Sequence, residues 1–215
     1  MPRRIIPFAN EYYYHIYNRG VEKRSIFENG NEYRRFIKTI KYYQFAGPKP
    51  KLSKFLYSPI VKVALNEKIV EVVCYCLMPN HFHLLLKQLK DGGITEFISK
   101  LSNSYTKYYN TKHTRVGPLL QGEFKAVLVE SDEQLVHLSR YIHLNPIASL
   151  LVRNLDDYRW SSYKEYIDDI DGICTKNGVM SLFKSPKDYQ QFILDQVNYA
   201  QELELIKHSL IDVDE

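Results

Sequence analysis

The 215-residue sequence is poor in cysteine and has no long hydrophobic run. None of its apolar stretches reaches the roughly 18 residues of a membrane-spanning helix, so no membrane segment is expected. Residues 1–7 lack the apolar segment of a secretion signal. The three cysteines are Cys74, Cys76 and Cys174. Cys74 and Cys76 would share one face of a strand and are poorly placed to form a disulfide with each other. A reducing, cytoplasmic location is therefore expected.

Charge is distributed unevenly along the chain. Residues 1–62 hold 13 Lys/Arg and 4 Asp/Glu, for a net charge of +9, whereas residues 131–215 hold 8 and 15, for a net charge of −7. A basic first third favours a polyanionic partner, although charged surfaces are often lopsided without a function. Many of the 18 tyrosines stand beside lysine or arginine. That combination suits single-stranded nucleic acid, although most of these rings are expected to pack in the core.

The hydrophobic pattern predicts the order β-α-β-β-α-β through residue 130. The expected elements are a strand at 12–17, a helix at 31–44, strands at 69–76 and 81–89, a helix at 95–111 and a strand at 123–129. This is the ferredoxin-like α+β arrangement, an antiparallel four-stranded sheet with helices on one face.

We expect the chain to consist of a core and an extension. The core would span residues 8–130 and include a basic, Pro-rich excursion at 46–62. Residues 131–215 would form a helical C-terminal extension packed on the core. Its first helix begins near Ser131 and is expected to bend or end at Asn145-Pro146.

His81 and His83 flank Phe82 at the start of the second strand of the predicted hairpin. Residues two apart on a strand share a face, so the two imidazoles could hold one divalent metal. On its own, the spacing of two histidines two residues apart more often marks exposed polar residues of a strand than a metal site. The following tyrosine-bearing helix and the basic flank favour the metal reading. His15, on a neighbouring strand, is expected to be structural.

Tyr105, inside the helix at 95–111, is the predicted nucleophile, with Tyr108 and Tyr109 as rivals nearer the helix end. A tyrosine that attacks phosphorus beside a metal would cut DNA and keep a covalent link to it, which allows rejoining.

Two histidines are too few ligands for a metal. Asn110 is the third candidate, and Gln121 and Glu123, near the next strand, are alternatives. A Cys74–Cys76 zinc site lacks a second cysteine pair.

Five motifs together resemble a known family. They are YHIYNRG (residues 14–20), LMPNHFHLL (77–85), SYTKYYN (104–110), QGEFK (121–125) and YIHLNP (141–146), followed by YRWSSY (158–163). They resemble the single-tyrosine HUH transposases of the IS200-like superfamily, most closely the REP-associated tyrosine transposases. The resemblance spans about residues 8–166.

The resemblance implies a ferredoxin-like enzyme that cleaves and rejoins single-stranded DNA near hairpins or palindromes. It would use Mg²⁺ or Mn²⁺ at His81 and His83 and a 5′-phosphotyrosine link at Tyr105, and act as a monomer or homodimer. The alternative is a hairpin- or repeat-binding regulator that does not cleave. Where Glu123 stands, an arginine is expected, and a carboxylate there would repel phosphate. The expected DNA contacts are Arg3, Arg4, Asn18, Arg19, Lys23, Arg24, Lys107 and Lys125.

Overall fold

The computed structural model describes residues 7–47, 50–57, 67–168 and 170–202. Its centre is a four-stranded antiparallel sheet with the strand order β2-β3-β1-β4. The strands are β1 (Tyr13–Arg19), β2 (Val70–Met78), β3 (His81–Gln88) and β4 (Lys125–Val129). Helix α1 (Gly30–Tyr43) connects β1 to β2, and α3 (Gly93–Lys112) connects β3 to β4. The predicted ferredoxin-like order is confirmed.

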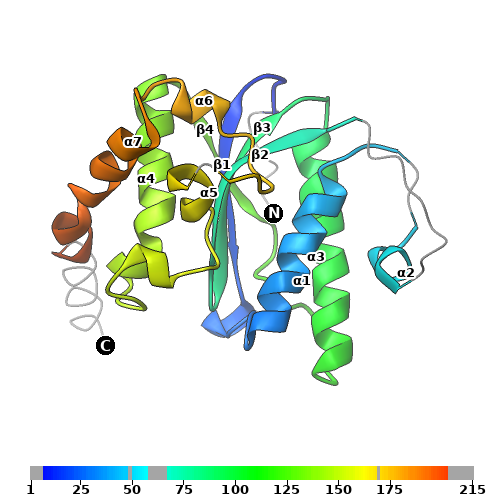
Figure 1. The fold of residues 1–215 in the computed structure, drawn as a ribbon. Coiled ribbons are helices and arrows are strands. Elements are labelled where there is room, and N and C mark those ends of the chain that lie inside the picture. The colour runs from blue at the N-terminus through cyan, green and yellow to red at the C-terminus, as the bar shows by residue number, and fades with distance from the viewer. Residues whose placement is uncertain (1–6, 48–49, 58–66, 169, 203–215) are drawn as a thin grey trace.

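Helices α1 and α3 cover one face of the sheet (Figure 1, right of the sheet). Along β3, Phe82, Leu84 and Leu86 point to this face and are fully buried there. Asn29 caps the N-terminus of α1, where its side chain accepts a hydrogen bond from the Asn31 amide. Its buried stripe repeats at helical spacing, so α1 packs on the sheet by the amphipathic pattern visible in the sequence.

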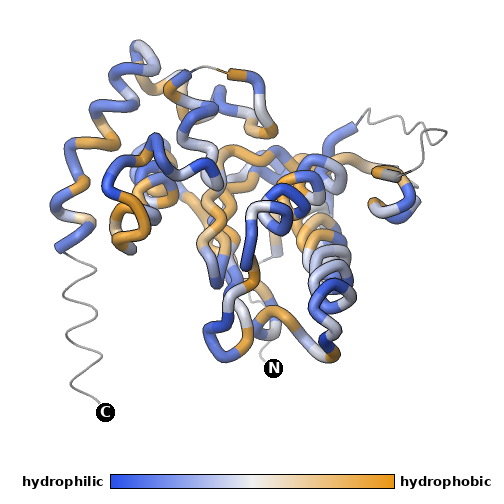
Figure 2. The backbone as a smooth tube through the Cα atoms, turned by 60° about the horizontal axis from the view of Figure 1, so that its bottom comes forward, coloured by the Kyte–Doolittle hydropathy of each residue, from blue (hydrophilic) through white to orange (hydrophobic). Residues whose placement is uncertain are grey.

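The C-terminal helices cover the opposite face (Figure 1, left of the sheet). They are α4 (Asp132–Ala148), α5 (Tyr163–Ile167), α6 (Asn177–Met180) and α7 (Pro186–Leu194). Leu85 of β3 and Ile142 of α4 belong to the core on this side. Figure 2 shows the result: the central strands are largely hydrophobic, and the surrounding helices alternate between hydrophobic and hydrophilic.

Three short helices lie in connections. They are α2 (Leu52–Tyr57) and the 3₁₀ turns η1 (Val21–Lys23) and η2 (Leu155–Asp157). Helix α2 belongs to the predicted excursion, of which residues 48–49 and 58–62 lie outside the described part. It is held to α1 by Tyr42, whose ring packs on Phe55 at 4.9 Å between centroids. Within the described ranges, no helix is long and apolar enough to cross a membrane.

Helix α4 continues through Pro146 to Ala148, so the prediction that it ends at Asn145-Pro146 is wrong. Pro146 lies in the last turn, where a missing N–H removes only one intrahelical hydrogen bond. The end is closed by the Ser149 amide, which donates to the Asn145 carbonyl, and by the Leu151 amide, which donates to the Pro146 carbonyl, both at 2.9 Å.

Residues 160–162 run along the outer edge of β2. The Leu77 amide donates to the Trp160 carbonyl and the Ser162 amide donates to the Tyr75 carbonyl, both at 2.9 Å. The Tyr75 amide in turn donates to Ser162 Oγ at 2.8 Å. The C-terminal part therefore satisfies backbone groups that an edge strand would otherwise expose.

A buried carboxylate ties the start of α1 to the end of α3. Glu32 is fully buried and accepts hydrogen bonds from Lys112 Nζ at 2.6 Å and from the Glu28 amide at 2.6 Å. Its Oε1 also lies 2.7 Å from His113 Nε2. Burial alone raises the pKa of Glu32, but these contacts more than offset burial and lower it from 4.5.

We predict that Glu32→Gln lowers the free energy of unfolding by about 1–3 kcal/mol at neutral pH, because Lys112 loses its charged partner. The folded-state pKa is depressed, so ionised Glu32 stabilises the fold above pH 4.5 and this contribution is lost as the pH falls below that value. Urea denaturation across this range should show a smaller acid loss in the variant than in the wild type. Glu96→Gln breaks the exposed pair with Lys100 and should change stability by less than about 0.5 kcal/mol.

Candidate functional site

A pocket of about 680 Å³ opens on the α4 side of the sheet, where β3 begins. His81 and His83 line it, together with Tyr17 from β1 and Tyr141 and Asn145 from α4. The rings of His81 and His83 are 5.0 Å apart between centroids. The prediction that the paired histidines share one face of a strand is confirmed.

Each of the two histidines is held through its Nδ1 atom. His83 Nδ1 lies 2.9 Å from Nε2 of His15 on the adjacent strand. His81 Nδ1 lies 2.6 Å from Oδ1 of Asn80, in the turn that precedes β3. Nε2 is therefore the atom through which either ring would bind a metal, and the Nδ1 partners would orient the rings.

His15 and His83 are neutral at physiological pH. Burial lowers the pKa of His15 to about 4. Burial, and then the nearby His81, His15 and Arg19, hold the pKa of His83 well below its ordinary value. Neutral imidazole is the form that binds metal, so this environment favours ligation over protonation.

Tyr141 and Asn145 come from one face of α4 and were not among the predicted site residues. Tyr141 is 48% exposed, and its ring lies edge-on to His83 with 5.6 Å between centroids. Asn145, one turn later, is buried, and its Nδ2 donates to the Tyr141 carbonyl at 2.7 Å. The sequence did contain an indication of this pair, because residues four apart in a helix lie on the same side.

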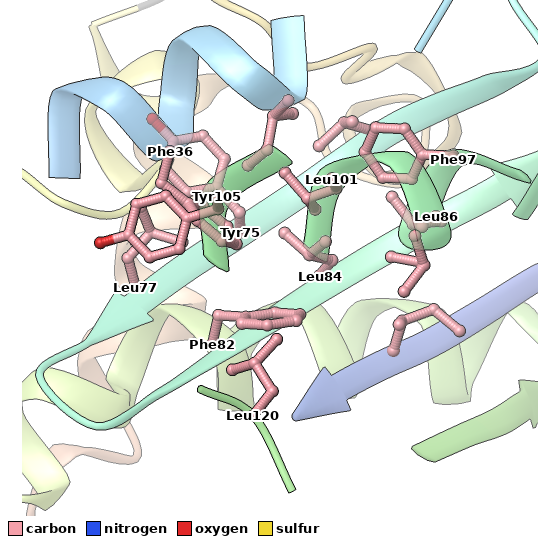
Figure 3. Close-up of a cluster of buried hydrophobic side chains, with 14 of the residues drawn as sticks. Phe36, Tyr75, Leu77, Phe82, Leu84, Leu86, Phe97, Leu101, Tyr105 and Leu120 are labelled. Atoms are coloured by element: carbon pink, nitrogen blue, oxygen red, sulfur yellow. The ribbon is translucent and has the colours of Figure 1, made fainter. Parts of the chain in front are cut away.

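Tyr105 lies on the other face of the sheet, so the prediction that it faces the histidines is wrong. Its side chain is fully buried between α1, α3 and the sheet, as Figure 3 shows for Tyr105, Phe36 and Phe82. The Tyr105 hydroxyl donates to the Ile26 carbonyl at 2.5 Å. Burial, with a smaller effect of Glu32, raises the pKa of Tyr105 far above its ordinary value. The sheet separates this phenol from the pocket.

Asn110 is also remote from the histidines. It lies in the last turn of α3, where Nδ2 donates to the Gly117 carbonyl at 2.8 Å and Oδ1 accepts from Arg115 at 2.9 Å. The prediction of Asn110 as a metal ligand is therefore wrong in its geometry. Glu123, the alternative, does line the pocket and is exposed. In the described part of the chain, no three His, Cys, Asp or Glu residues form a metal cluster.

The predicted DNA contacts are divided between several places. Asn18, Arg19 and Lys125 line the pocket, together with Arg140, which was not among the predicted contacts. Lys23 and Arg24 lie in and after the η1 turn, which follows β1. Lys107 is exposed on α3, across the sheet from the pocket. Arg3 and Arg4 are outside the described residues.

The sequence model of IS200-like transposases matches residues 9–145. The chain belongs to the IS200-like transposase family. The match covers the whole sheet and ends at Asn145 in α4, so it includes every histidine and tyrosine named in the pocket above. Family membership makes the chain a DNA-processing enzyme. No curated protein matches it significantly.

This IS200-like transposase also resembles a solved structure, that of a REP-associated tyrosine transposase bound to a REP hairpin. The TM-score is 0.56 at 14% sequence identity, covering 78% of this chain and 86% of that chain. At this identity, the likeness concerns the fold.

We predict that Tyr105→Phe leaves DNA cleavage by this transposase intact and lowers its unfolding free energy by about 1–3 kcal/mol. The variant leaves the buried Ile26 carbonyl without its donor and removes nothing from the pocket. Thermal denaturation and nicking of labelled hairpin-bearing single-stranded DNA with Mn²⁺ measure the two effects. A folded Tyr105→Phe protein that cannot nick would return Tyr105 to the catalytic role.

Proposed function

We propose that the chain is a metal-dependent strand transferase that cleaves and rejoins single-stranded DNA near hairpins through a 5′-phosphotyrosine at Tyr141. The observation that carries this proposal is the shared pocket, in which Tyr141 and Asn145 of α4 meet His81 and His83 of β3. Membership in the IS200-like family supports the reaction class. The hairpin bound by the structurally similar REP-associated transposase supports the substrate class.

His81, His83 and Asn145 would hold one Mg²⁺ or Mn²⁺ ion. Their donor set fits, because two imidazoles stand beside an amide whose Nδ2 is hydrogen-bonded to the Tyr141 carbonyl, which leaves Oδ1 as the ligating atom. Glu123 and Gln121 supply further oxygen atoms at the rim of the pocket. When bound, the ion would neutralise a phosphodiester oxygen and make the phosphorus more electrophilic.

Tyr141 is the nucleophile in this proposal. Its Oη attacks phosphorus, and the new O–P bond forms as the P–O3′ bond breaks. The phenol proton passes to solvent, and the departing 3′ oxygen takes up a proton from solvent to become a hydroxyl. Arg19, Lys125 and Arg140 line the same pocket and would bind the phosphates on either side. The reverse attack by a 3′ hydroxyl rejoins the strand.

Two other tyrosines line the pocket but fit the role less well. Tyr17 stacks on His15 at 4.9 Å between ring centroids, on the sheet itself. Tyr199 lies after α7 and is 59% exposed. Tyr141 alone sits in a long helix one turn from an amide that could share its metal. Fixed geometry between nucleophile and metal is what the reaction requires.

We predict that Tyr141→Phe abolishes the covalent protein–DNA adduct, because phenylalanine lacks the attacking oxygen. Labelled hairpin DNA is incubated with the protein and Mn²⁺, the mixture is denatured, and protein-linked label is measured. Tyr199→Phe is the matched control and should keep the adduct. An adduct that survives Tyr141→Phe and is lost in Tyr199→Phe contradicts the assignment. A wild-type protein that shifts DNA in a native gel but forms no adduct is a non-cleaving regulator.

We also predict that Asn145→Ala weakens Mn²⁺ binding at least about tenfold, since even the loss of an outer-shell partner weakens metal sites by about 10–100-fold. Isothermal titration calorimetry without DNA measures the affinity directly. Asn110→Ala, at the far end of α3, should leave it unchanged. If Glu123→Gln weakens binding and Asn145→Ala does not, the third ligand is Glu123.

A further inference from the structure

A second groove, of about 880 Å³, runs beside α3 and adjoins the pocket that holds the histidines. It is formed by one side of α3, by residues 118–124 before β4 and by Pro7 and Phe8 near the N-terminus. Asn18 and Glu123 line both hollows. A strand of DNA that leaves the pocket past these two residues would enter the groove without crossing the protein.

Apart from Glu123, the polar residues of the groove are uncharged hydrogen-bonding groups. Thr95, Ser99, Ser102 and Thr106 line it from α3 at intervals of four, three and four residues, which places them on one side of the helix. Glu123 is the only charged residue among the described residues that line it, and no lysine or arginine is among them. The pocket, by contrast, holds Arg19, Lys125 and Arg140. The pocket therefore suits phosphates, whereas the groove suits neutral groups that donate and accept hydrogen bonds.

The groove also contains an aromatic pair. The rings of Phe8 and Phe124 both line it, and they lie parallel within 8° at 6.2 Å between centroids. Both rings are only partly buried. Aromatic faces beside neutral hydrogen-bonding groups are the chemistry that binds unpaired bases, because every base has a flat face to stack and polar edges to bond.

We propose that this groove binds the unpaired bases of the DNA strand whose phosphate occupies the pocket. The inference rests on the proposed function, since it takes the substrate strand from there. Phosphates would contact the cations of the pocket, and the strand would then pass Asn18 and Glu123 and insert its bases between α3 and the Phe8–Phe124 pair. Recognition of unpaired sequence would then depend on residues on the far side of the sheet from the cleavage chemistry.

Photocrosslinking tests the location. The full chain is mixed with an oligothymidylate about 20 nucleotides long that carries 5-iododeoxyuridine, in EDTA so that no cleavage occurs, then irradiated and mapped by mass spectrometry. We expect crosslinks at Phe8 or Phe124 in addition to Tyr17 or Tyr141. Crosslinks confined to the pocket would overturn this inference and leave the proposed function standing. Crosslinks at the groove alone would support the inference and count against the catalytic pocket, and the absence of crosslinks would overturn both.

A pair of matched variants tests the contribution to binding. Ser102 lines the groove, whereas Ser104, equally partly buried on the same helix, does not. Ser102→Leu fills the groove without changing charge and should weaken binding of a fluorescein-labelled oligothymidylate at least about fivefold, the smallest effect expected from losing one stacked base. Ser104→Leu should stay within about twofold, and circular dichroism checks that both variants fold. Equal affinities for the two variants would overturn the proposal. Mn²⁺ affinity, which reports on the pocket, should be unchanged in both.

Discussion

Along β3, every side chain must point to one of two faces, and helices cover both. His81, His83 and Leu85 face α4, while Phe82 and Leu84 face α1 and α3. The register is held on both sides, since His83 pairs with Tyr17 of β1 and with Cys76 of β2. A slip of one residue would bury the histidines under α3 and expose the phenylalanine. Any group that acts with these histidines must therefore come from the α4 side.

The position of α4 in turn depends on the C-terminal third of the chain. His143, between Tyr141 and Asn145, is fully buried, with Nδ1 2.8 Å from the Tyr189 hydroxyl of α7 and Nε2 2.8 Å from Ser162 Oγ. Burial lowers the pKa of His143 to about 3, so the ring stays neutral and both nitrogens serve as hydrogen-bonding groups. These contacts fix the rotation of α4 about its axis. The acidic C-terminal third is thus part of what aims Tyr141 at the pocket.

Periodicity was sufficient to predict the strands, the two long helices of the core and the shared face of His81 and His83, because these depend on neighbours in sequence. It could not show which face of the sheet the later helices would cover, since that depends on packing between distant segments. Tyr105 continues the apolar stripe of Phe97 and Leu101, and this spacing already indicated a core residue. Tyr141 and Asn145, four apart, were readable as a pair, but only the fold brings them to the histidines. The polar stripe of α3 that lines the groove is visible in the sequence, but the segments that complete the groove are brought to it only by the fold.

The segment 160–162 that lies along β2 has a consequence for how the chain can be divided. A fragment ending at the predicted boundary near residue 130 would keep every strand of the sheet, yet it would lose the partner of β2 and the apolar cover over Leu85 and Cys76. The backbone N–H and C=O groups at the outer edge of β2 would then be unpaired. They could hydrogen-bond to another extended chain, which promotes aggregation. Expression trials of a minimal catalytic piece should therefore keep the sequence at least through α7, even though the family match stops at Asn145.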